Sequence, residues 1–453
     1  MISLAWFSPM PPIRSGVAAC SAALVAGLRP EYAIDVFVDE PVARVAPGTH
    51  SAHEFVWRHR AQRYDLTVYQ LGNSSHHDYA WPYVFRWPGL AVLHDAHLHH
   101  ARAAALLRIA RADDYRAEFA ANHPDGDPAV AEMAIQGFDS HLYYDWPMTR
   151  LVVEASRVTA VHSRATAGIL RGLHPAARIE PVRLGHGTLV TPAREQDARV
   201  RVRRRYGLPE TALIVGCFGG LTPEKRVPQI LAGFDAVLGN DPAAFLLLAG
   251  SAAEHYDVRA DLDARGLTGR AVLTGYLESE EELTDCIAAS DIAVNLRWPT
   301  AREVSGPWLR CLAAGKPTII TDLAHLAGVP SLDPRTWTVR SSGRPHDDGD
   351  GAGRPEAAVC VAVDILDEDH SLRLALRRLA TDAALRETLG RAARTYWTHE
   401  HAIESMLEDY RRVIALAIDR RTPECPLPAH LTNDGTALLQ TLLGPFGLPA
   451  PLR

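Results

Sequence analysis

Short apolar runs rich in β-forming residues alternate with helical patterns along the chain, and this cycle starts a second time near the middle. Strands that are buried on both faces of a parallel sheet have this composition, and helices connect them. The sequence therefore predicts two α/β domains in succession. The predicted strands are Ile2–Phe7, Ile34–Val38, Leu66–Gln70, Leu90–Leu93 and Val158–Val161 in the first half, and Leu213–Phe218, Phe245–Ala249, Ala271–Leu273, Ile292–Leu296 and Thr318–Ile320 in the second.

The length of 453 residues also favours two domains, because single hydrophobic cores usually stop growing well below this size. We expect an N-terminal domain over residues 1–190, with a helical insertion at about 97–154, and a second domain over 191–395. Helical patterns and a proline-rich tail follow over 396–453, and we expect them to cross back to the N-terminal domain. The polar segment Thr191–Arg205 has no strand pattern and is interpreted as the joint between the domains, and Ser341–Pro355 as a surface loop.

Composition excludes several classes of protein. A net charge of -7 argues against a general affinity for nucleic acid, which requires a concentrated basic face. The sequence contains no apolar stretch long enough to span a bilayer, and its first residues lack the basic start of a signal peptide, so we expect a cytoplasmic protein. The six cysteines show no C-x-x-C spacing, which makes disulfides and zinc sites unexpected.

A glycine turn in the second half has the features of an anion site. The predicted strand ending at Phe218 leads into Gly219-Gly220-Leu-Thr-Pro-Glu-Lys225, and Pro228 suits the first turn of the following helix. Glycines let backbone N–H groups approach a ligand closely, and Lys225 adds a full positive charge for a pyrophosphate. The alternative is an ordinary strand–helix turn with a solvated lysine.

A second cluster follows the predicted strand Ile292–Leu296. Here Glu303 precedes Ser305 and Gly306 at the start of a predicted helix. A glutamate at this position can accept hydrogen bonds from sugar hydroxyls, and the free N–H groups of the helix start can bind a phosphate. The alternative is that Glu303 only caps the helix.

In the first half, His94 directly follows the strand Leu90–Leu93, at the sheet edge where open α/β sheets bind ligands. Its imidazole can donate to a sugar hydroxyl or stabilise charge near an anomeric carbon. The nearby His97, His99 and His100 could instead ligate a metal or be ordinary polar residues at a helix start. The loop that ends at Ser15 and Gly16 could let a donor or an acceptor approach the backbone.

Taken in order, these motifs resemble the retaining glycosyltransferases of the GT-B fold, specifically glycosyltransferase family 4, over nearly the whole chain. In the first half the resemblance rests on Pro-x-x-Ser-Gly-Val-Ala at 12–18, Leu-His-Asp at 93–95, Ala-Val-His-Ser at 160–163 and Leu-Gly-His-Gly at 184–187. In the second half it rests on the Gly219 turn, Leu-Leu-Leu-Ala-Gly at 246–250, Thr-Gly-Tyr-Leu at 274–277 and the Glu303 segment.

The resemblance implies two Rossmann-like parallel-sheet domains facing a central cleft, and transfer of a sugar from a nucleotide diphosphate with retention of configuration. It implies no cofactor and no metal, because protein cations and helix termini would neutralise the leaving diphosphate. The catalytic residues would be His94 and Glu303. The donor site would comprise Gly219, Gly220, Lys225, Tyr276, Leu277, Ser305, Gly306 and Arg310, and Ser15 and Gly16 would form the glycine loop of the first domain.

The sequence departs from the family pattern at two positions. Many members have an arginine directly after the glycine of the phosphate loop, where this chain has Gly220, so one phosphate contact must come from elsewhere or is missing. Many also have a second glutamate eight positions after the first, where this chain has Cys311. A thiol cannot accept a ribose hydroxyl proton as a carboxylate does.

Several alternatives remain open from the sequence. The nearest are a sugar-nucleotide epimerase or a glycan phosphorylase of similar architecture, a non-catalytic protein that binds nucleotide sugars, and a metal-dependent hydrolase. The acceptor could be a small molecule, a lipid or a glycan. The segment 101–111 could present an amphipathic face to a membrane, or it could pack into the core.

Overall fold

The computed structural model describes residues 1–39, 48–138, 141–340, 357–433 and 435–447. It divides into two compact units. Unit 1 comprises Met1–Pro181 together with Tyr410–Arg453, and unit 2 comprises Val182–Asp409. The predicted surface loop Ser341–Pro355 lies outside the described residues.

Unit 1 contains a seven-stranded sheet in which every neighbouring pair of strands is parallel. The strand order is β3-β2-β1-β4-β5-β6-β7, so the chain moves to one side after β1 and returns to the other side with β4. The aromatic rings of Phe7, Phe37 and Tyr69 stack across β1, β2 and β4 at centroid distances of 5.0–5.1 Å. The strands are β1 (Ile2–Phe7), β2 (Tyr32–Val38), β3 (Thr49–Ser51), β4 (Leu66–Leu71), β5 (Leu90–Leu93), β6 (Val158–Val161) and β7 (Ile179–Pro181).

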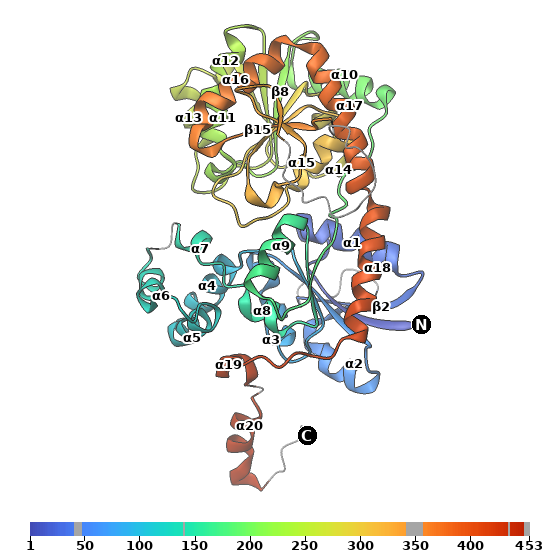
Figure 1. Ribbon diagram of the computed structural model, residues 1–453, viewed down its shortest axis with the longest axis vertical. Helices are drawn as coiled ribbons and strands as arrows, with labels where there is room; N and C mark the ends of the chain where they lie inside the picture. The colour runs from blue at the N-terminus through green and yellow to red at the C-terminus, as the bar shows by residue number, and fades with distance from the viewer. Residues whose placement is uncertain (40–47, 139–140, 341–356, 434, 448–453) are drawn as a thin grey trace. The chain divides into compact units, whose positions relative to one another are not determined.

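The predicted insertion is a group of short helices beside the sheet of unit 1 (Figure 1). Its own small core includes Ala103, Leu106, Tyr115 and Phe119. The apolar face of the segment 101–111 is thus used in packing, apart from the exposed Ile109. The insertion helices are α4 (His99–Leu107), α5 (Ala112–Asn122), α6 (Pro128–Ile135), α7 (Leu142–Asp145) and α8 (Arg150–Ala155).

The remaining helices of unit 1 cover the sheet or follow it. They are α1 (Gly16–Leu28), α2 (Phe55–Ala61), α3 (Trp81–Val84), α9 (Arg164–Leu173), α19 (Ala429–Thr432) and α20 (Thr436–Leu443). Helix α18 (Ile403–Asp419) begins in unit 2 and continues into unit 1, where Tyr410 stacks on Trp6 at a centroid distance of 5.9 Å. None of the described helices is both long and apolar enough to cross a membrane.

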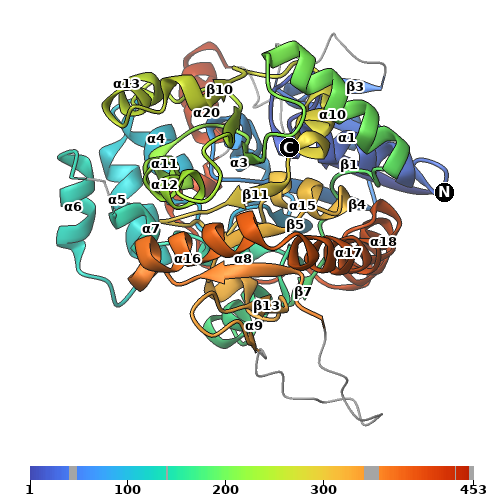
Figure 2. The ribbon, with the colours of Figure 1, turned by 90° about the horizontal axis from the view of Figure 1, so that it is seen from above.

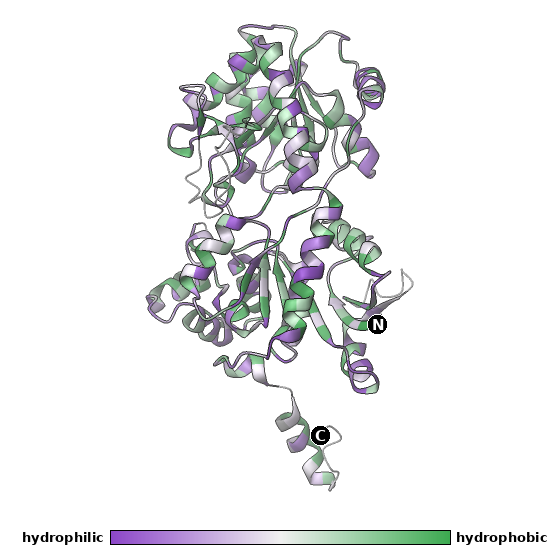
Figure 3. Ribbon diagram, turned by 45° about the vertical axis from the view of Figure 1, so that its right-hand side comes forward, coloured by the Kyte–Doolittle hydropathy of each residue, from purple (hydrophilic) through white to green (hydrophobic). Residues whose placement is uncertain are grey.

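Unit 2 contains an eight-stranded sheet of order β10-β9-β8-β11-β12-β15-β13-β14. Its neighbouring strands are parallel except for the antiparallel pair β13 and β14. The strands of both sheets are mainly hydrophobic (Figure 3), as expected for sheets with helices on both faces. The strands are β8 (Ile214–Phe218), β9 (Phe245–Ala249), β10 (Ala271–Leu273), β11 (Ile292–Asn295), β12 (Thr318–Thr321), β13 (Ser331–Leu332), β14 (Val339–Arg340) and β15 (Cys360–Val363).

The helices of unit 2 include two long ones near its end, α16 and α17, which run along the orange part of the ribbon in Figure 2. The main helices are α10 (Pro192–Tyr206), α11 (Val227–Gly233), α12 (Asp235–Leu238), α13 (Val258–Ala264), α14 (Glu280–Ala289), α15 (Gly306–Ala313), α16 (Glu368–Thr381) and α17 (Ala383–Glu400). The two parallel-sheet units confirm the predicted fold class of two α/β domains.

One segment differs from its interpretation. We interpreted Thr191–Arg205 as the joint between domains, but these residues form helix α10 of unit 2, capped by the Thr191 side chain, which accepts from the Arg194 N–H. The apolar face of this helix is narrow, and therefore few of its side chains are buried. Ion pairs to α14 replace apolar contacts on the rest of its surface, including Arg201 with Asp285 and Arg205 with Glu282. Because arginines replace apolar residues on most of this helix, the sequence pattern did not predict it.

Candidate functional site

A pocket of about 210 Å³ lies in unit 2, where three neighbouring strands of the sheet end. Phe218, Asn295 and Thr321 are the last residues of β8, β11 and β12, and all three line the pocket. From β8 the chain continues to β9 on one side of the sheet, whereas β11 pairs with β8 on the other side. The pocket therefore lies at the switch point of the strand order, where open parallel sheets bind ligands.

Three predicted donor-site residues and the predicted catalytic Glu303 line this pocket together. Lys225 enters from the turn after β8, whereas Glu303, Ser305 and Gly306 come from the segment between β11 and α15. The two halves of the predicted site are 78 positions apart in the sequence and meet because β8 and β11 are neighbours. The lining also includes Arg297, His325 and Trp308, to which the sequence analysis gave no role.

Local interactions fix the position of Lys225. Thr222 caps the short turn Pro223–Lys225 by accepting a hydrogen bond from the Lys225 N–H at 3.3 Å. The next residue, Arg226, has a left-handed backbone (φ 57) and is held by two hydrogen bonds of 2.9 Å to the carboxylate of Glu368. Of the two adjacent cations, only Lys225 lines the pocket.

The ammonium of Lys225 has no carboxylate within ion-pairing distance among the described residues. Its pKa is lowered to about 8, mainly by burial and also by the nearby Arg297, while Cys217 and Glu303 act in the opposite direction. A partly desolvated cation without a bound carboxylate attracts anions strongly. Lys225 is therefore suited to bind a phosphate group.

Gly219 gives Lys225 the space it occupies. A Cβ atom on Gly219 would lie 2.5 Å from Lys225 Nζ, and its φ of +88° also favours glycine. Its N–H donates to the Ala249 carbonyl at 2.9 Å, so this amide does not serve as the anion ligand that the sequence analysis expected. Gly220 has no such requirement, since a Cβ there would meet no atom closer than 4.0 Å. Neither glycine lines the pocket.

Helix α15 directs its N-terminus at the pocket. Ser305 is the N-cap and accepts a hydrogen bond from the Trp308 N–H at 3.3 Å, and Pro307 lies in the first turn. The indole N–H of the buried Trp308 donates to Thr318 Oγ1 at 3.1 Å, which fixes the helix on β12. The positive end of the helix dipole and the amide of Gly306 therefore add to the attraction for an anion.

Glu303 does not act as the helix cap, because Ser305 does. Its carboxylate forms an ion pair with Arg297 and accepts a hydrogen bond from Thr300 Oγ1 at 2.9 Å. Burial lowers the pKa of the neighbouring His325 to about 4, although its contacts with Glu303 oppose this shift, so this imidazole is neutral near pH 7. The alternative that the Glu303 side chain only caps the helix is therefore wrong.

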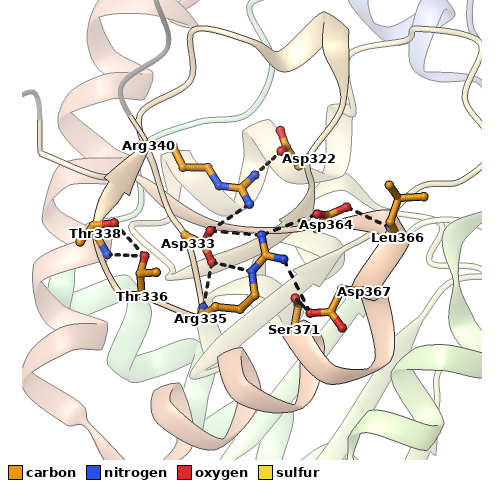
Figure 4. Close-up of polar contacts among 10 residues, drawn as sticks. All are labelled: Asp322, Asp333, Arg335, Thr336, Thr338, Arg340, Asp364, Leu366, Asp367 and Ser371. Atoms are coloured by element: carbon orange, nitrogen blue, oxygen red, sulfur yellow. Dashed lines mark hydrogen bonds and ion pairs between the residues drawn. The ribbon is translucent and has the colours of Figure 1, made fainter.

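Figure 4 shows arginine–aspartate pairs that connect Asp322, next to the pocket-lining Leu323, with residues at the ends of neighbouring strands. Asp322, directly after β12, pairs with Arg340, which also contacts Asp333 at 3.2 Å. Burial would raise the pKa of Asp333, but its hydrogen bonds with Arg335 and Arg340 lower it to about 2. Asp333 therefore stays charged and keeps this network intact near neutral pH.

Besides Gly219 and Gly220, three more predicted donor-site residues lie outside the pocket lining. Arg310, on α15, donates to His186 Nε2 at 3.1 Å and pairs with Glu280, so its guanidinium is already engaged. Tyr276 and Leu277 follow β10. The ring of Tyr276 is exposed, and Leu277 packs against a hydrophobic cluster of unit 2. Cys311, at the position of the second family glutamate, is fully buried, and burial raises the pKa of its thiol to about 12.

The predicted residues of unit 1 also follow strand ends. Ser15 caps α1 by accepting from the Ala18 N–H at 3.0 Å, and a Cβ on Gly16 would meet no atom within 4 Å. His94 follows β5, and its Nε2–H donates to Gln70 Oε1 at 2.8 Å. The same oxygen accepts from the buried Tyr410 hydroxyl at 3.2 Å, so α18 helps to hold the imidazole in place.

The other histidines of the string after β5 do not form a metal site in the described residues, where no three His, Cys, Asp or Glu side chains gather at a suitable spacing. The ring of His99 is buried and bonds to Tyr115 and to the Trp146 carbonyl. His100 contacts Asn73 at 3.0 Å. All six cysteines are free thiols.

No protein-family model matches this sequence, and no curated protein is significantly similar to it. Its structure is similar to several solved structures of glycosyltransferases. HepE from Anabaena, in complex with UDP and glucose, is 13% identical with a TM-score of 0.59, and the match covers 92% of this chain and 100% of HepE.

Two other structures show the same similarity. A glycosyltransferase from Rickettsia africae is 11% identical with a TM-score of 0.60, and the match covers 93% of this chain and 99% of that one. The catalytic domain of starch synthase IV from Arabidopsis thaliana, bound to ADP and acarbose, is 12% identical with a TM-score of 0.56, over 93% and 100% of the two chains. The chain described here has the two-domain GT-B fold of these glycosyltransferases.

Proposed function

We propose that this protein is a glycosyltransferase that takes its sugar from a nucleoside diphosphate sugar bound in the pocket of unit 2. The observation that carries the proposal is the meeting of Lys225, Glu303 and the N-terminus of α15 in one pocket at the strand ends. The ammonium and the helix terminus suit a diphosphate, and the carboxylate suits sugar hydroxyls. The HepE and starch synthase structures contain UDP with glucose and ADP with acarbose, which supports a nucleotide-binding role for this fold.

The same groups support metal-independent transfer. When the bond between the sugar and the diphosphate breaks, negative charge grows on the leaving phosphate. Lys225 and the helix N-terminus would stabilise this charge in place of a divalent cation. We further propose that transfer retains the anomeric configuration, as the resemblance to glycosyltransferase family 4 implies. His94 is the residue we assign to the sugar or acceptor from unit 1, because its Nε2–H is fixed by Gln70 and its ring follows a strand end.

The test measures binding and turnover separately. A thermal-shift panel of UDP, GDP, ADP and the matching nucleosides identifies the base, because a ligand that binds only the folded protein raises the melting temperature. Release of free nucleoside diphosphate from the matching nucleotide sugar then reports activity, with and without EDTA. We expect a diphosphate to stabilise the protein much more than its nucleoside does, and activity to survive EDTA.

The variant Glu303→Gln should lose at least 100-fold in turnover while the fold is retained, because an amide replaces the carboxylate that would accept from the sugar. The control Glu387→Gln, in an exposed pair on α17, should behave as wild type. Binding of nucleotide sugars with no turnover over a broad acceptor panel would favour a non-catalytic sugar-nucleotide binder. Absence of nucleoside diphosphate binding would contradict the proposal.

A further inference from the structure

Arg297 lies beside Lys225 and Glu303 and is positioned by its backbone. Its N–H donates to Thr321 Oγ1 at 2.9 Å, at the end of β12. The N–H of the next residue, Trp298, donates to the Glu224 carbonyl at 2.7 Å, in the turn that carries Lys225. Two hydrogen bonds thus fasten this segment between β12 and the lysine turn. The Arg297 side chain lines the same pocket as Lys225.

The ion pair between Arg297 and Glu303 is not an ideal match. The two side chains are 32% and 19% exposed. Arg297 Nε and Glu303 Oε1 are buried atoms, and neither makes a hydrogen bond of suitable geometry among the described residues. A guanidinium usually binds a carboxylate or a phosphate through two parallel N–H donors. The contact with Glu303 therefore leaves hydrogen-bonding capacity of Arg297 unused.

The charge balance of the pocket also favours a second anion partner. Among the residues that line the pocket, Lys225 and Arg297 each carry a positive charge and Glu303 carries a negative charge. A nucleoside diphosphate sugar has one negative charge on each phosphate, so Lys225 alone would leave one uncompensated. Gly220, in the turn after β8, offers no charge.

We propose that Arg297 is the second diphosphate-binding cation and that Glu303 is its partner only while the donor is absent. On donor binding, a phosphate oxygen replaces the Glu303 carboxylate on the guanidinium. The freed carboxylate then accepts hydrogen bonds from the sugar hydroxyls. Donor binding thus exchanges one ion pair for another and makes Glu303 available only when a diphosphate is in place. This inference rests on the proposed function.

The test is a double-mutant cycle on the affinity for the nucleoside diphosphate that binds wild-type protein, measured by calorimetry. Arg297→Ala should weaken binding of the diphosphate by 10- to 100-fold and leave binding of the nucleoside within about twofold, as for loss of a charge-assisted hydrogen bond. Arg297→Lys should fall between the two. Glu303→Gln should bind the diphosphate several-fold more tightly than wild type, because the competing carboxylate is gone.

The cycle separates the exchange from a simple loss of negative charge. In the Arg297→Ala background, Glu303→Gln should give a gain of less than about twofold, whereas an equal gain in both backgrounds would overturn the exchange. Unchanged diphosphate affinity in both Arg297 variants would overturn the role of Arg297. The control Arg391→Ala, at an exposed arginine of α17, should match wild type. If wild-type protein binds no nucleoside diphosphate, the proposed function itself is wrong.

Discussion

Lys225 and Lys316 are the two lysines of this chain, and they have opposite surroundings. Lys316 is buried, and its ammonium donates to Glu195 at 2.5 Å. Lys225 has no such partner among the described residues, and burial lowers its pKa from 10.5 to about 8. A charge that is desolvated without compensation costs free energy of folding. Lys225 thus has the properties of a residue kept for binding at the expense of stability.

We predict that Lys225→Met stabilises the folded protein at pH 7 by on the order of 1–3 kcal/mol and abolishes diphosphate binding. Between pH 8 and 10.5 the unfolded wild type holds a proton on this lysine that the folded state has lost, so wild-type stability rises with pH. The advantage of the variant should therefore shrink over this range. Urea unfolding at several pH values measures the difference. Lys316→Met, which leaves Glu195 without its partner, should be destabilising, and the same gain in both variants would contradict the argument.

At the scale of the element, the sequence predicted the strands that are long, apolar and bounded by turns. Strands β1, β2, β4, β5 and β6 and strands β8 to β12 lie within two residues of their predicted bounds. The short strands β3, β7, β13 and β14 were not predicted, because two or three residues carry no periodicity. Strand β15 is central and buried but was also missed, since a run of four apolar residues next to a helical pattern is ambiguous.

Sequence patterns predicted part of the candidate site as well. Lys225 and Glu303 were predicted from their positions after strands, and the order of β8 and β11 in the sheet brings them together. Arg297 also follows a strand, but only the spatial contacts with Lys225 and Glu303 give it a role. The engagement of Arg310 by His186 and Glu280 depends on side-chain geometry across three segments, which no sequence pattern contains.

The turn after β8 and the turn after β9 are in direct backbone contact. A Cβ atom on Gly250 would lie 2.0 Å from the Gly219 carbonyl oxygen, and backbone atoms cannot move aside as a flexible side chain can. We predict that Gly250→Ala costs about 1–3 kcal/mol of stability and weakens diphosphate binding, because it displaces the turn that makes room for Lys225. Thermal unfolding and calorimetry measure the two effects. Gly239→Ala, where the nearest atom would be 3.5 Å away, should change neither, and equal behaviour of the two variants would refute this account.

At the scale of the whole molecule, the residues that line the pocket all belong to unit 2. Each unit has its own sheet and its own hydrophobic core. Binding of a nucleoside diphosphate should therefore directly reduce the motion of residues in unit 2 only. The residues concerned lie in three segments that follow β8, β11 and β12.

We predict that a nucleoside diphosphate slows amide hydrogen exchange in peptides that cover 217–225, 294–308 and 320–326 more than in any peptide of unit 1. Ligand contacts and the loss of local opening both reduce exchange. Mass spectrometry of the exchanged protein gives the measurement, and the Lys225→Met variant with the same ligand is the control. Protection centred on the strand ends of β1, β4 and β5 would place the nucleotide in the other unit and contradict the prediction.

The two ends of unit 2 are fastened to each other. Arg183, at its start, bonds to Asp409, at its end, through both its backbone N–H and its guanidinium at 2.8 Å. The His401 ring bonds to the Leu184 carbonyl at 2.9 Å. Tyr410, the residue after Asp409, already packs on Trp6 of unit 1. A gene fragment for residues 182–409 would thus encode a polypeptide whose two ends are held together by hydrogen bonds. Such a fragment would be small enough for residue-by-residue NMR titration with nucleotides.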